Sequence, residues 1–147
     1  MFGQLNNPRV GFWDGRSLPE SAASMSTKYL MRAIARRVNL EAERVSNNGV
    51  LVPDLLNITR WMPGYELTPH ADREEPDGSP HGMPWRDFAA MVYLNDDYSG
   101  GEIYFPNQNI TLKPTKGDLV IFPGTLEFLH GVKETTSGVR YTLTSFY

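Results

Sequence analysis

The sequence predicts a mainly β fold, a barrel or jelly roll packed against one N-terminal helix. A single helical pattern occupies the first third of the 147 residues, and eight short strand-like segments with turn residues between them follow it. Helices do not alternate with these segments, as a parallel Rossmann-type sheet would require. One helix followed by many short strands is typical of a barrel or jelly roll that carries the helix on its outside.

Length and composition limit what the chain can do. At 147 residues we expect a single domain, with residues 1–49 as helical support and residues 50–147 as the barrel. A chain of this size buries about two-thirds of its unfolded surface, so it needs no disulfide or structural metal to fold. The absence of cysteine excludes disulfide scaffolds, zinc ribbons, iron–sulfur clusters and thiol catalysis. Any metal must be held by carboxylates and by the three histidines, His70, His81 and His130.

Charge and hydropathy argue against two classes of partner. The net charge of −3 gives no broad attraction to nucleic acid or to an anionic membrane. No apolar stretch approaches the roughly 18 residues of a membrane-spanning helix. The first residues lack a basic region followed by an apolar run, so they do not resemble a secretion signal. We therefore expect a soluble, cytoplasmic protein with no nucleic-acid or membrane partner.

The helix is expected to begin at Ser17. Residues 1–16 carry the turn signals Asn7-Pro8 and Asp14-Gly15 and should be irregular. Ser17 and Glu20 then have the spacing of a capping box. The helical repeat runs through Tyr29, Leu30, Ala33, Ile34, Arg37 and Val38, and Asn47-Asn48-Gly49 ends it. A solvated helix face, rather than a nucleic-acid patch, is expected for the arginines of this segment: Arg32, Arg36, Arg37 and Arg44.

The strand-like segments follow Gly49. They are Leu55–Trp61, Glu66–Asp72, Phe88–Leu94, Glu102–Phe105, Asn109–Lys113, Asp118–Phe122, Leu129–Lys133 and Val139–Phe146. Among the connections, Arg73–Trp85 stands out because it is thirteen residues long, polar and rich in proline and glycine. Loops of this length are usually functional lids or disordered, and both alternatives are open here.

A metal site is indicated where the second strand-like segment ends. Alternation places residues i and i+2 on one strand face, so the side chains of His70 and Asp72 point the same way. With a third ligand they would form the 2-His-1-carboxylate triad of non-haem Fe(II) oxygenases. A lone His-x-Asp pair is a weak motif, because a hydrogen-bonded surface histidine gives the same pattern. His130, 60 residues downstream, is either a further ligand or a satisfied histidine at a strand start.

The last strand contains an arginine that suggests an anion site. Alternation puts Arg140, Thr142 and Thr144 on one face of this strand. An arginine inside an apolar barrel strand is costly unless it meets an anion, and its planar fork suits a bidentate carboxylate. The Thr142 hydroxyl can donate to the same anion. The alternative is an exposed Arg140 paired with Glu134 or Asp72.

Taken in order, six motifs between residues 57 and 147 resemble a known family. They are Pro63-Gly64 before Pro69-His70-Ala71-Asp72, then Val92-Tyr93-Leu94-Asn95-Asp96, Gly100-Gly101-Glu102-Ile103-Tyr104-Phe105-Pro106, Lys116-Gly117-Asp118-Leu119-Val120-Ile121-Phe122-Pro123, His130-Gly131-Val132 and Gly138-Val139-Arg140-Tyr141. The chain thereby resembles the 2-oxoglutarate/Fe(II)-dependent dioxygenases, in particular the prolyl 4-hydroxylase-like branch. The resemblance covers nearly two-thirds of the chain.

The resemblance implies a double-stranded β-helix that uses Fe(II), 2-oxoglutarate and O₂, with ascorbate as a helpful addition. It makes three residues the iron ligands: His70, Asp72 and His130. Arg140 would bind the distal carboxylate of 2-oxoglutarate, and the Tyr93 phenol would support that carboxylate. Thr142 or Thr144 would lie beside it. Both histidines must be neutral to bind iron, so iron affinity should fall at low pH.

The chain departs from the family pattern at two places. The family often has a tyrosine shortly before the Pro-Gly, where this chain has Arg60-Trp61-Met62. Trp61 therefore either lines the cosubstrate pocket without a phenol or is a core residue against the helix. The N-terminal helical support is also short, so the substrate groove should be more open or be completed by a partner chain.

The substrate is open at this level. The resemblance favours a hydroxylase of peptidyl proline, with Arg73, Met83 and Trp85 of the long loop as candidate substrate contacts, unless this loop is simply exposed and flexible. A small molecule or free amino acid is the alternative. Nucleic-acid demethylation is disfavoured because that branch carries a second arginine where this chain has Phe146, and a jelly-roll binding module without activity is disfavoured by the intact site. His81 is expected to be a lid or surface residue and not a fourth ligand.

Overall fold

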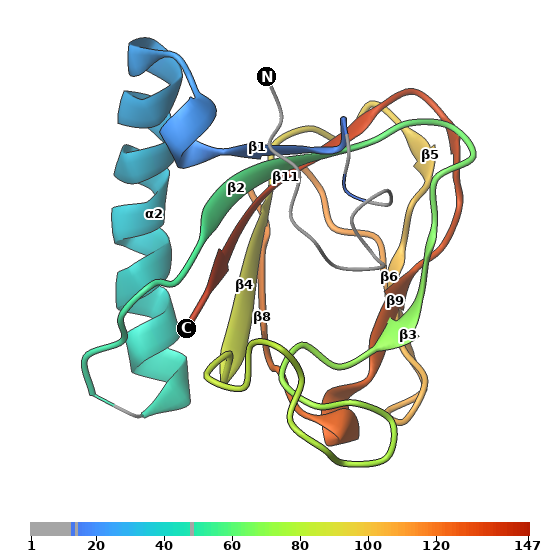
Figure 1. Ribbon diagram of the computed structural model, residues 1–147. Coiled ribbons are helices and arrows are strands. Elements are labelled where there is room, and N and C mark those ends of the chain that lie inside the picture. The colour runs from blue at the N-terminus through green and yellow to red at the C-terminus, as the bar shows by residue number, and fades with distance from the viewer. Residues whose placement is uncertain (1–12, 14, 48) are drawn as a thin grey trace.

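The computed structural model describes residues 13, 15–47 and 49–147 and shows two facing sheets with one long helix on the outside (Figure 1). The expectation for residues 1–12, for Asp14 and for Asn48 lies outside the described residues. The larger sheet is antiparallel, in the order β1 (Ser17–Pro19), β2 (Leu56–Trp61), β11 (Arg140–Phe146), β4 (Phe88–Tyr93) and β8 (Leu119–Pro123). All eight expected strands are present; seven are shorter than expected, and β8 is shifted by one residue from the expected Asp118–Phe122.

The smaller sheet faces the larger one. Its order is β3 (Leu67–His70), β9 (His130–Val132), β6 (Ile103–Phe105) and β7 (Ile110–Leu112), again antiparallel. A further pair joins β10 (Thr135–Ser137) to β5 (Ser99–Gly100), and two short 3₁₀ turns, η1 (Glu20–Ala22) and η2 (Leu126–Phe128), complete the elements. The two facing antiparallel sheets, between which the chain passes repeatedly, confirm the jelly-roll prediction.

The long helix begins later than expected. Helix α2 spans Met25–Ser46, and its N-cap is Ser24, whose hydroxyl accepts a hydrogen bond from the Thr27 N–H at 3.3 Å. Ser17 instead begins β1, so the capping-box prediction was wrong. The C-terminal prediction was right, since Asn47 ends the helix in the left-handed conformation with φ of 54°.

Helix α2 covers the outer face of the larger sheet. Met31, Val38 and Ala42 are buried against Val92 and Leu143 of strands β4 and β11. The helix face that carries Tyr29 and Leu30 is exposed, as are the four arginines of the segment, so the solvated-face prediction for the arginines is confirmed. Because helix and sheet bury each other's apolar surface on this side, the opposite face of the sheet is free to line the barrel interior.

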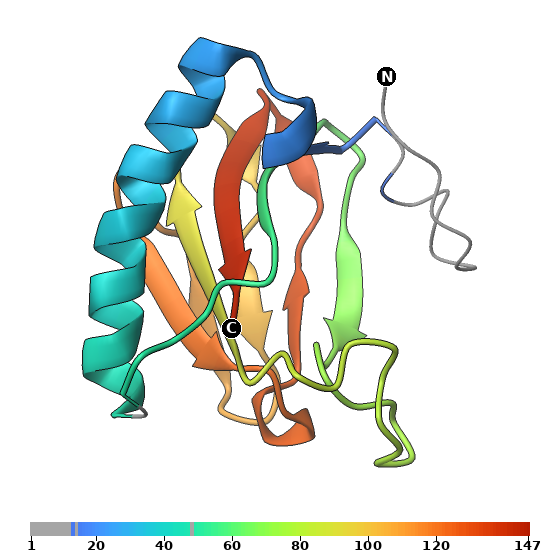
Figure 2. The ribbon, with the colours of Figure 1, turned by 60° about the vertical axis from the view of Figure 1, so that its left-hand side comes forward.

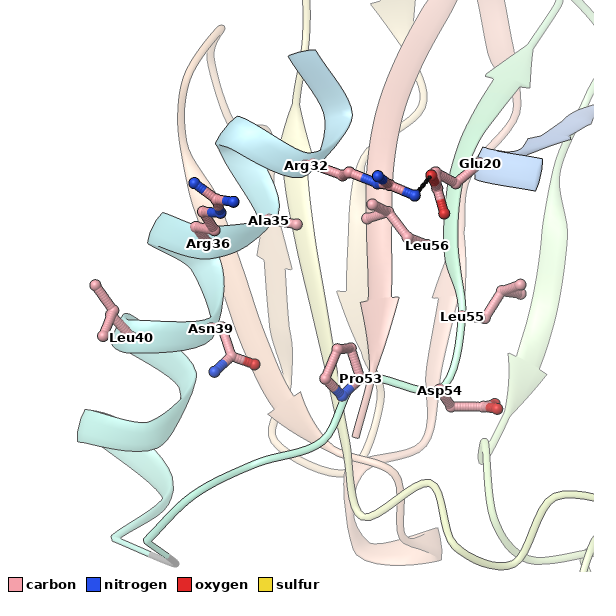
Figure 3. Close-up of a pocket in the computed structure, with 10 residues that line it drawn as sticks. All are labelled: Glu20, Arg32, Ala35, Arg36, Asn39, Leu40, Pro53, Asp54, Leu55 and Leu56. Atoms are coloured by element: carbon pink, nitrogen blue, oxygen red, sulfur yellow. Dashed lines mark ion pairs between the residues drawn. The ribbon is translucent and has the colours of Figure 1, made fainter. Parts of the chain in front are cut away.

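A groove of about 700 Å³ lies between α2 and the chain segment that enters β2 (Figure 3). Its walls are partly apolar, with Leu40 on the helix and Pro53, Leu55 and Leu56 on the segment. Leu56 packs with the cluster under α2, so this groove is on the outer side of the larger sheet. It is therefore separate from the barrel interior.

The barrel interior has an apolar part and a polar part. Tyr93, Ile103, Phe105 and Phe122 form a buried cluster between the sheets. Next to it, the larger sheet directs polar side chains inward, and these are buried: Asn57, Thr59, Arg140, Thr142 and Thr144. Interiors tolerate such groups only when they are paired or serve a ligand, so this polar region is where a site is expected.

The long connection Arg73–Trp85 is a folded excursion. A β-bridge joins Glu74 to Pro80, the Gly78 N–H donates to the Glu75 carbonyl at 2.8 Å, and the Asp77 carboxylate accepts from the backbone N–H of Ser79 at 2.9 Å. These bonds give the connection a defined structure, which argues against a disordered loop, and its role as a lid stays a prediction. Among the described residues, no helix has the length and apolar character needed to cross a bilayer.

Candidate functional site

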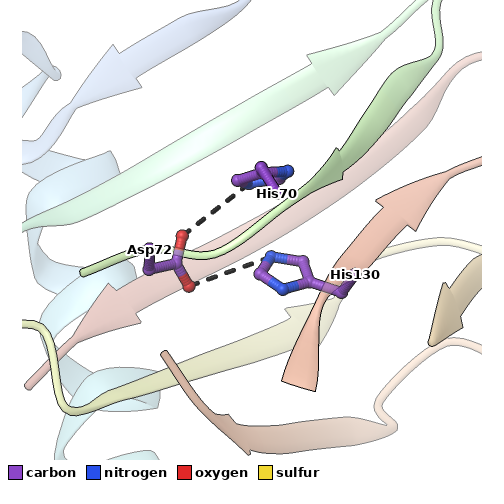
Figure 4. A group of neighbouring side chains, drawn as sticks. All are labelled: His70, Asp72 and His130. Carbon is purple, nitrogen blue, oxygen red and sulfur yellow. Dashed lines mark ion pairs between the residues drawn. The ribbon is translucent and has the colours of Figure 1, made fainter. Parts of the chain in front are cut away.

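His70 and His130 meet across a pair of neighbouring strands (Figure 4). They are register partners between β3 and β9, and their ring centroids are 4.4 Å apart. Asp72 follows two residues after His70, and its carboxylate oxygens are each 3.8 Å from one Nε2 atom, Oδ1 from His70 and Oδ2 from His130. One ligand atom from each residue lies within 4.8 Å of the others. Within the described part of the chain, no other three histidine or carboxylate side chains gather in this way.

The backbone orients both imidazole rings. Nδ1 of His70 lies 3.1 Å from the Thr68 carbonyl, and Nδ1 of His130 lies 3.2 Å from the Phe128 carbonyl. A carbonyl only accepts, so each Nδ1 carries the proton and each Nε2 keeps a lone pair. Such outer contacts are how proteins fix the tautomer of metal-binding histidines. Both lone pairs therefore belong to the atoms nearest Asp72.

Burial keeps His130 neutral. Its side chain is 6% exposed, and burial lowers its pKa to about 4, against the opposing effect of the Asp72 carboxylate. Asp72 is also buried, and its Oδ2 accepts no hydrogen bond. His70 is the most accessible of the three, with 16% of its side chain exposed. The site is thus reached from the side of β3, an edge strand.

Close backbone packing holds Asp72 in place. The N–H groups of Asp72 and Arg73 both donate to the Gly124 carbonyl, at 3.0 and 3.1 Å. A Cβ on Gly124 would lie 2.2 Å from the Arg86 carbonyl oxygen and 3.3 Å from Cβ of Asp72. Position 124 therefore accepts only glycine without a shift of the chain beside the ligand.

Arg140 lies in the polar part of the interior and is completely buried. Its Nη2 donates to the Tyr93 hydroxyl at 3.0 Å, and its guanidinium carbon lies 5.2 Å from the Trp61 ring centroid. Its Nε and Nη1 have no hydrogen-bond partner, and no carboxylate of the described residues pairs with it. The alternative of an exposed arginine paired with Glu134 or Asp72 was therefore wrong.

Two hydroxyl groups accompany this cation. Thr142 is the register partner of Tyr93, is completely buried, and its Oγ1 has no hydrogen-bond partner. Burial raises the pKa of the Tyr93 phenol, and the Arg140 charge opposes this only in part. The phenol is therefore protonated at neutral pH, accepts from Arg140 and has its own proton to donate. Arg140, Tyr93 and Thr142 together offer donors and no acceptor charge, an arrangement suited to an anion.

Several further residues lie where the resemblance places them or near them. Thr144 is buried on the same inner face and is the register partner of Met91 of β4. Trp61 is 3% exposed and contacts Arg140 instead of packing against α2, so its interpretation as a core residue against the helix was wrong. Tyr98 and Gly101 also lie next to Arg140, and neither was among the site residues expected from the sequence.

Gly101 and Tyr98 both limit the space around the Arg140 side chain. A Cβ on Gly101 would lie 3.1 Å from Cδ of Arg140 and 3.1 Å from Oγ1 of Thr135. The positive charge of Arg140 lowers the pKa of the Tyr98 phenol, although burial raises it overall. Gly101 falls within the Gly100-Gly101-Glu102 motif, so the motif was a signal for it. Tyr98 carried no signal in the sequence.

The loop residues lie outside the ligand cluster. His81 is largely buried, with 12% of its side chain exposed and its Nε2 3.7 Å from Glu75, so it is neither a fourth ligand nor a surface residue. Arg73 pairs with Asp87 and with Glu74. Met83 is half-buried, whereas Trp85 is 56% exposed.

Both groups that the resemblance implies fit the residues present. Two imidazoles and a buried carboxylate with an unused oxygen are the donor set for Fe(II). The buried Arg140 with two unpartnered nitrogens, beside the unpartnered Thr142 hydroxyl, fits a carboxylate of 2-oxoglutarate.

Comparison with known proteins agrees with this site. The chain is 27% identical over 137 residues to prolyl 4-hydroxylase 1 of Arabidopsis thaliana, a match that covers 80% of this chain and 47% of the relative. It is 34% identical over 113 residues to human prolyl 3-hydroxylase 3, covering 74% of this chain and 13% of the relative. The chain thus spans about half of the first relative and a small part of the second.

A solved structure shows the same fold. The viral collagen prolyl hydroxylase from Paramecium bursaria Chlorella virus-1, in complex with 2-oxoglutarate, superposes with a TM-score of 0.67 at 18% identity, covering 88% of this chain and 76% of that one. The family model described as the 2OG-Fe(II) oxygenase superfamily matches residues 56–147. This match runs from β2 to the last residue and takes in the three clustered ligands and Arg140, so the chain belongs to the 2OG-Fe(II) oxygenase superfamily.

Proposed function

We propose that this chain hydroxylates an unactivated C–H bond of a peptidyl proline, using Fe(II), 2-oxoglutarate and O₂. The observation that carries the proposal is the pairing of a His-Asp-His cluster with a buried arginine that has no counter-ion in the described chain. Iron bound at the cluster supplies the oxidising chemistry when the cosubstrate and O₂ are present. The protein's own residues bind, orient and exclude water.

His70, Asp72 and His130 would hold the metal. The Nε2 atom of His130 needs no deprotonation near neutral pH, since burial lowers the pKa of this histidine to about 4. Asp72 supplies the single negative charge of the ligand set. We assign the role of general base to no side chain, because the metal and the cosubstrate perform the oxidation.

Arg140 would orient 2-oxoglutarate by its distal carboxylate. The bidentate fork of a guanidinium fixes both position and direction of a carboxylate, and the protonated Tyr93 phenol and the Thr142 hydroxyl add donors. Thr144 and Trp61 line the same inner region. Because Arg140 is completely buried, this ion pair would form in a water-poor interior, where charge interactions are stronger.

The choice of proline rests on the relatives. Those described above are named as prolyl 4-hydroxylase, prolyl 3-hydroxylase and collagen prolyl hydroxylase. These names differ in the ring position, so the proposal covers C3 and C4 alike. A small molecule or free amino acid is the alternative substrate class.

Trp85 is the best placed of the three candidate substrate contacts. The Gly124 N–H donates to the Asp87 carbonyl at 2.8 Å, and Gly124 also accepts from the Asp72 N–H, so the segment after Trp85 lies beside an iron ligand. Its exposed indole offers an apolar surface for a proline ring. Arg73 is less available because Asp87 and Glu74 hold it, and Met83 is half-buried.

The test is turnover with a panel of proline-containing peptides, free proline and a proline-free peptide. We expect succinate release together with a mass gain of one oxygen on a proline peptide, and enhancement by ascorbate. Loss of both products in His130→Ala, with both kept in the exposed-site control Tyr29→Ala, would support the ligand assignment. A product from free proline alone would move the substrate to the small-molecule class. The absence of any 2-oxoglutarate turnover or binding would refute the enzyme function.

A further inference from the structure

The turn before β1, which contains Gly15 and Arg16, is hydrogen-bonded to β2 beside the proposed cosubstrate region. The Arg60 N–H donates to the Arg16 carbonyl at 2.7 Å, and Nη2 of Arg60 donates to the Gly15 carbonyl at 2.8 Å. The Arg16 N–H in turn donates to the Trp13 carbonyl at 3.0 Å. Figure 2 shows β1 lying next to the segment that leads from β2 to β3. The turn is thus fixed to the end of β2. Trp61 is the last residue of this strand, and the connection to β3 follows it.

Side chains of this turn contact the connection directly. The Trp13 ring meets the Trp61 ring edge to face, with centroids 6.2 Å apart and planes at 82°. The Arg16 guanidinium carbon lies 3.5 Å from the centroid of the Tyr65 ring and 6.0 Å from that of Trp61. Tyr65 is itself held, because its carbonyl accepts from the Thr135 N–H at 3.0 Å. The result is a cluster of three aromatic side chains and one guanidinium group, which we call the Trp13 wall: Trp13, Arg16, Trp61 and Tyr65.

Within this wall, Trp61 is the residue that contacts Arg140. It is the register partner of Arg140, and the guanidinium carbon of Arg140 lies 5.2 Å from its ring centroid. Trp61 is 3% exposed, whereas Trp13 is 38% exposed, so Trp13 is the outer layer and Trp61 the inner one. Water that reached the Arg140 region from this side would have to pass the two indoles. A guanidinium–carboxylate pair weakens when water enters, because the effective dielectric constant rises.

We propose that Trp13 and Arg16 are positioning residues for 2-oxoglutarate: they hold the Trp61 indole beside Arg140 and close the outer side of the cosubstrate pocket. This inference rests on the proposed function. Neither residue touches the cosubstrate carboxylate, since both act through Trp61. The tyrosine that the family often carries before the Pro-Gly is thereby replaced, in this chain, by an indole that a second indole supports.

The expected effect is on cosubstrate affinity and not on turnover at saturation. Edge-to-face aromatic pairs contribute enough for loss of one to weaken a dependent equilibrium by up to about tenfold. Trp13→Ala should therefore raise the dissociation constant for 2-oxoglutarate by about tenfold, and Trp13→Phe should restore most of the affinity because it keeps an aromatic edge. The iron ligands are on β3 and β9 and just beyond, so Fe(II) affinity should not change.

The experiment is an anaerobic titration of Fe(II)-loaded protein with 2-oxoglutarate, followed by the weak visible charge-transfer absorption and by calorimetry. We expect Trp13→Ala to shift the titration midpoint and to leave the position of the band unchanged. Arg16→Met should shift the midpoint in the same direction. Tyr29→Ala, which removes an aromatic ring 75% exposed on α2, serves as the matched control and should titrate as the wild type does. In steady state, KM for 2-oxoglutarate should rise in Trp13→Ala while kcat stays the same.

The outcomes separate this inference from the proposed function. Wild-type affinity in Trp13→Ala would overturn the wall and leave the enzyme function intact. Equal losses of Fe(II) and 2-oxoglutarate affinity, not rescued by Trp13→Phe, would mean a general structural role and would also overturn it. An unshifted Arg16→Met would remove Arg16 from the wall. A wild-type protein that binds no 2-oxoglutarate would overturn both proposals together.

Discussion

Arg140 carries a full positive charge in the barrel interior, and only one of its nitrogens, Nη2, has protein partners. Removing a charge from water costs several kcal/mol unless an opposite charge compensates it. The described chain offers Arg140 the Tyr93 hydroxyl, the Met91 sulfur and aromatic rings, but no carboxylate. The protein without cosubstrate therefore bears a cost that a bound dicarboxylate would offset.

This cost predicts an unusual result for the replacement of a buried residue. Arg140→Met should leave the stability of the ligand-free protein within about 1 kcal/mol of wild type, or raise it, because a buried uncompensated charge is replaced by an apolar chain. The same variant should lose stabilisation by 2-oxoglutarate, which at a concentration about 100-fold above the dissociation constant adds about 2.7 kcal/mol to the wild type. Thermal unfolding with and without cosubstrate, in the presence of Fe(II) under argon, measures both. A large loss of stability in the ligand-free variant would contradict this account of Arg140.

His130 gives the metal-free protein a specific acid sensitivity. Its pKa is about 4 in the folded protein, against 6.5 for an unperturbed histidine, so protonation favours the unfolded chain. Stability should be fully present above pH 6.5 and should fall, by about 3 kcal/mol in all, as the pH drops from there to about 4. Urea unfolding of wild type and His130→Gln at several pH values measures the difference. Parallel pH profiles for the two proteins would rule out this role of burial.

The residues of the metal cluster were predictable from the sequence, and those around Arg140 only in part. The His-x-Asp spacing suggested His70 and Asp72, although β3 ends at His70, and the family resemblance added His130 as the third ligand. Arg140 stood out because a charge inside an apolar strand needs a partner. Tyr98 could not be predicted, because its approach to Arg140 depends on how β5 and β10 pair, and strand pairing is not written in local patterns.

At the scale of elements, the turn that carries Gly100 and Gly101 sets the shape of the anion site. Both glycines have positive φ, of 71° and 68°. A Cβ on Gly100 would lie 2.1 Å from the Glu134 carbonyl oxygen, and one on Gly101 would press on the stem of Arg140. The paired glycines thus let β5 and β10 approach closely and leave room for the arginine.

A matched pair of substitutions separates strain from displacement. Gly101→Ala and Gly117→Ala both place alanine at positive φ, 68° and 94°, which costs about 1–2 kcal/mol each. Nothing lies within 4 Å of a Cβ at Gly117, whereas Arg140 and Thr135 lie at 3.1 Å from a Cβ at Gly101. Both variants should lose stability, but only Gly101→Ala should also weaken 2-oxoglutarate binding, as anaerobic titration measures. Equal affinities in the two variants would contradict the displacement of Arg140.

The start of α2 shows where pattern reasoning fails for an element. Ser17 and Glu20 have capping-box spacing, yet Ser17–Pro19 pairs with β2 as an extra edge strand. The real cap, Ser24, comes seven residues later and is followed by Thr27 instead of glutamate or glutamine. Local capping chemistry allowed either start, and the long-range pairing of β1 with β2 decided between them.

At the scale of the whole molecule, two apolar cores support the fold, and the inter-sheet core borders the metal cluster, since the His130 ring lies 4.4 Å from that of Phe122. One core lies between α2 and the larger sheet and another between the two sheets, and each consists of many buried apolar side chains. A chain of 147 residues has enough such surface to fold without a structural metal. Neither core has a metal ligand among its apolar members.

Metal removal should therefore abolish activity and leave the fold in place. After EDTA treatment and dialysis we expect the far-ultraviolet circular dichroism to be unchanged and cooperative thermal unfolding to persist, at a lower midpoint than with Fe(II). Restoring Fe(II) should restore the midpoint and turnover. Loss of the circular dichroism signal on chelation would instead mean that metal binding and folding are one event, as in zinc fingers.

The pairing of His70 with His130 has a consequence for the edge of the smaller sheet. Strand β3 is an edge strand with only two register pairs to β9, a bulge between them, and Pro69, which can donate no ladder bond. An ion held by both imidazoles would cross-link the edge strand to its neighbour at the position where the ladder ends. Iron supply would then govern how long this edge stays closed to proteases and to strand exchange with other chains. Bound iron would then stabilise the edge of the smaller sheet in addition to its role in the oxidation. Under iron limitation, this protein would have a shorter lifetime.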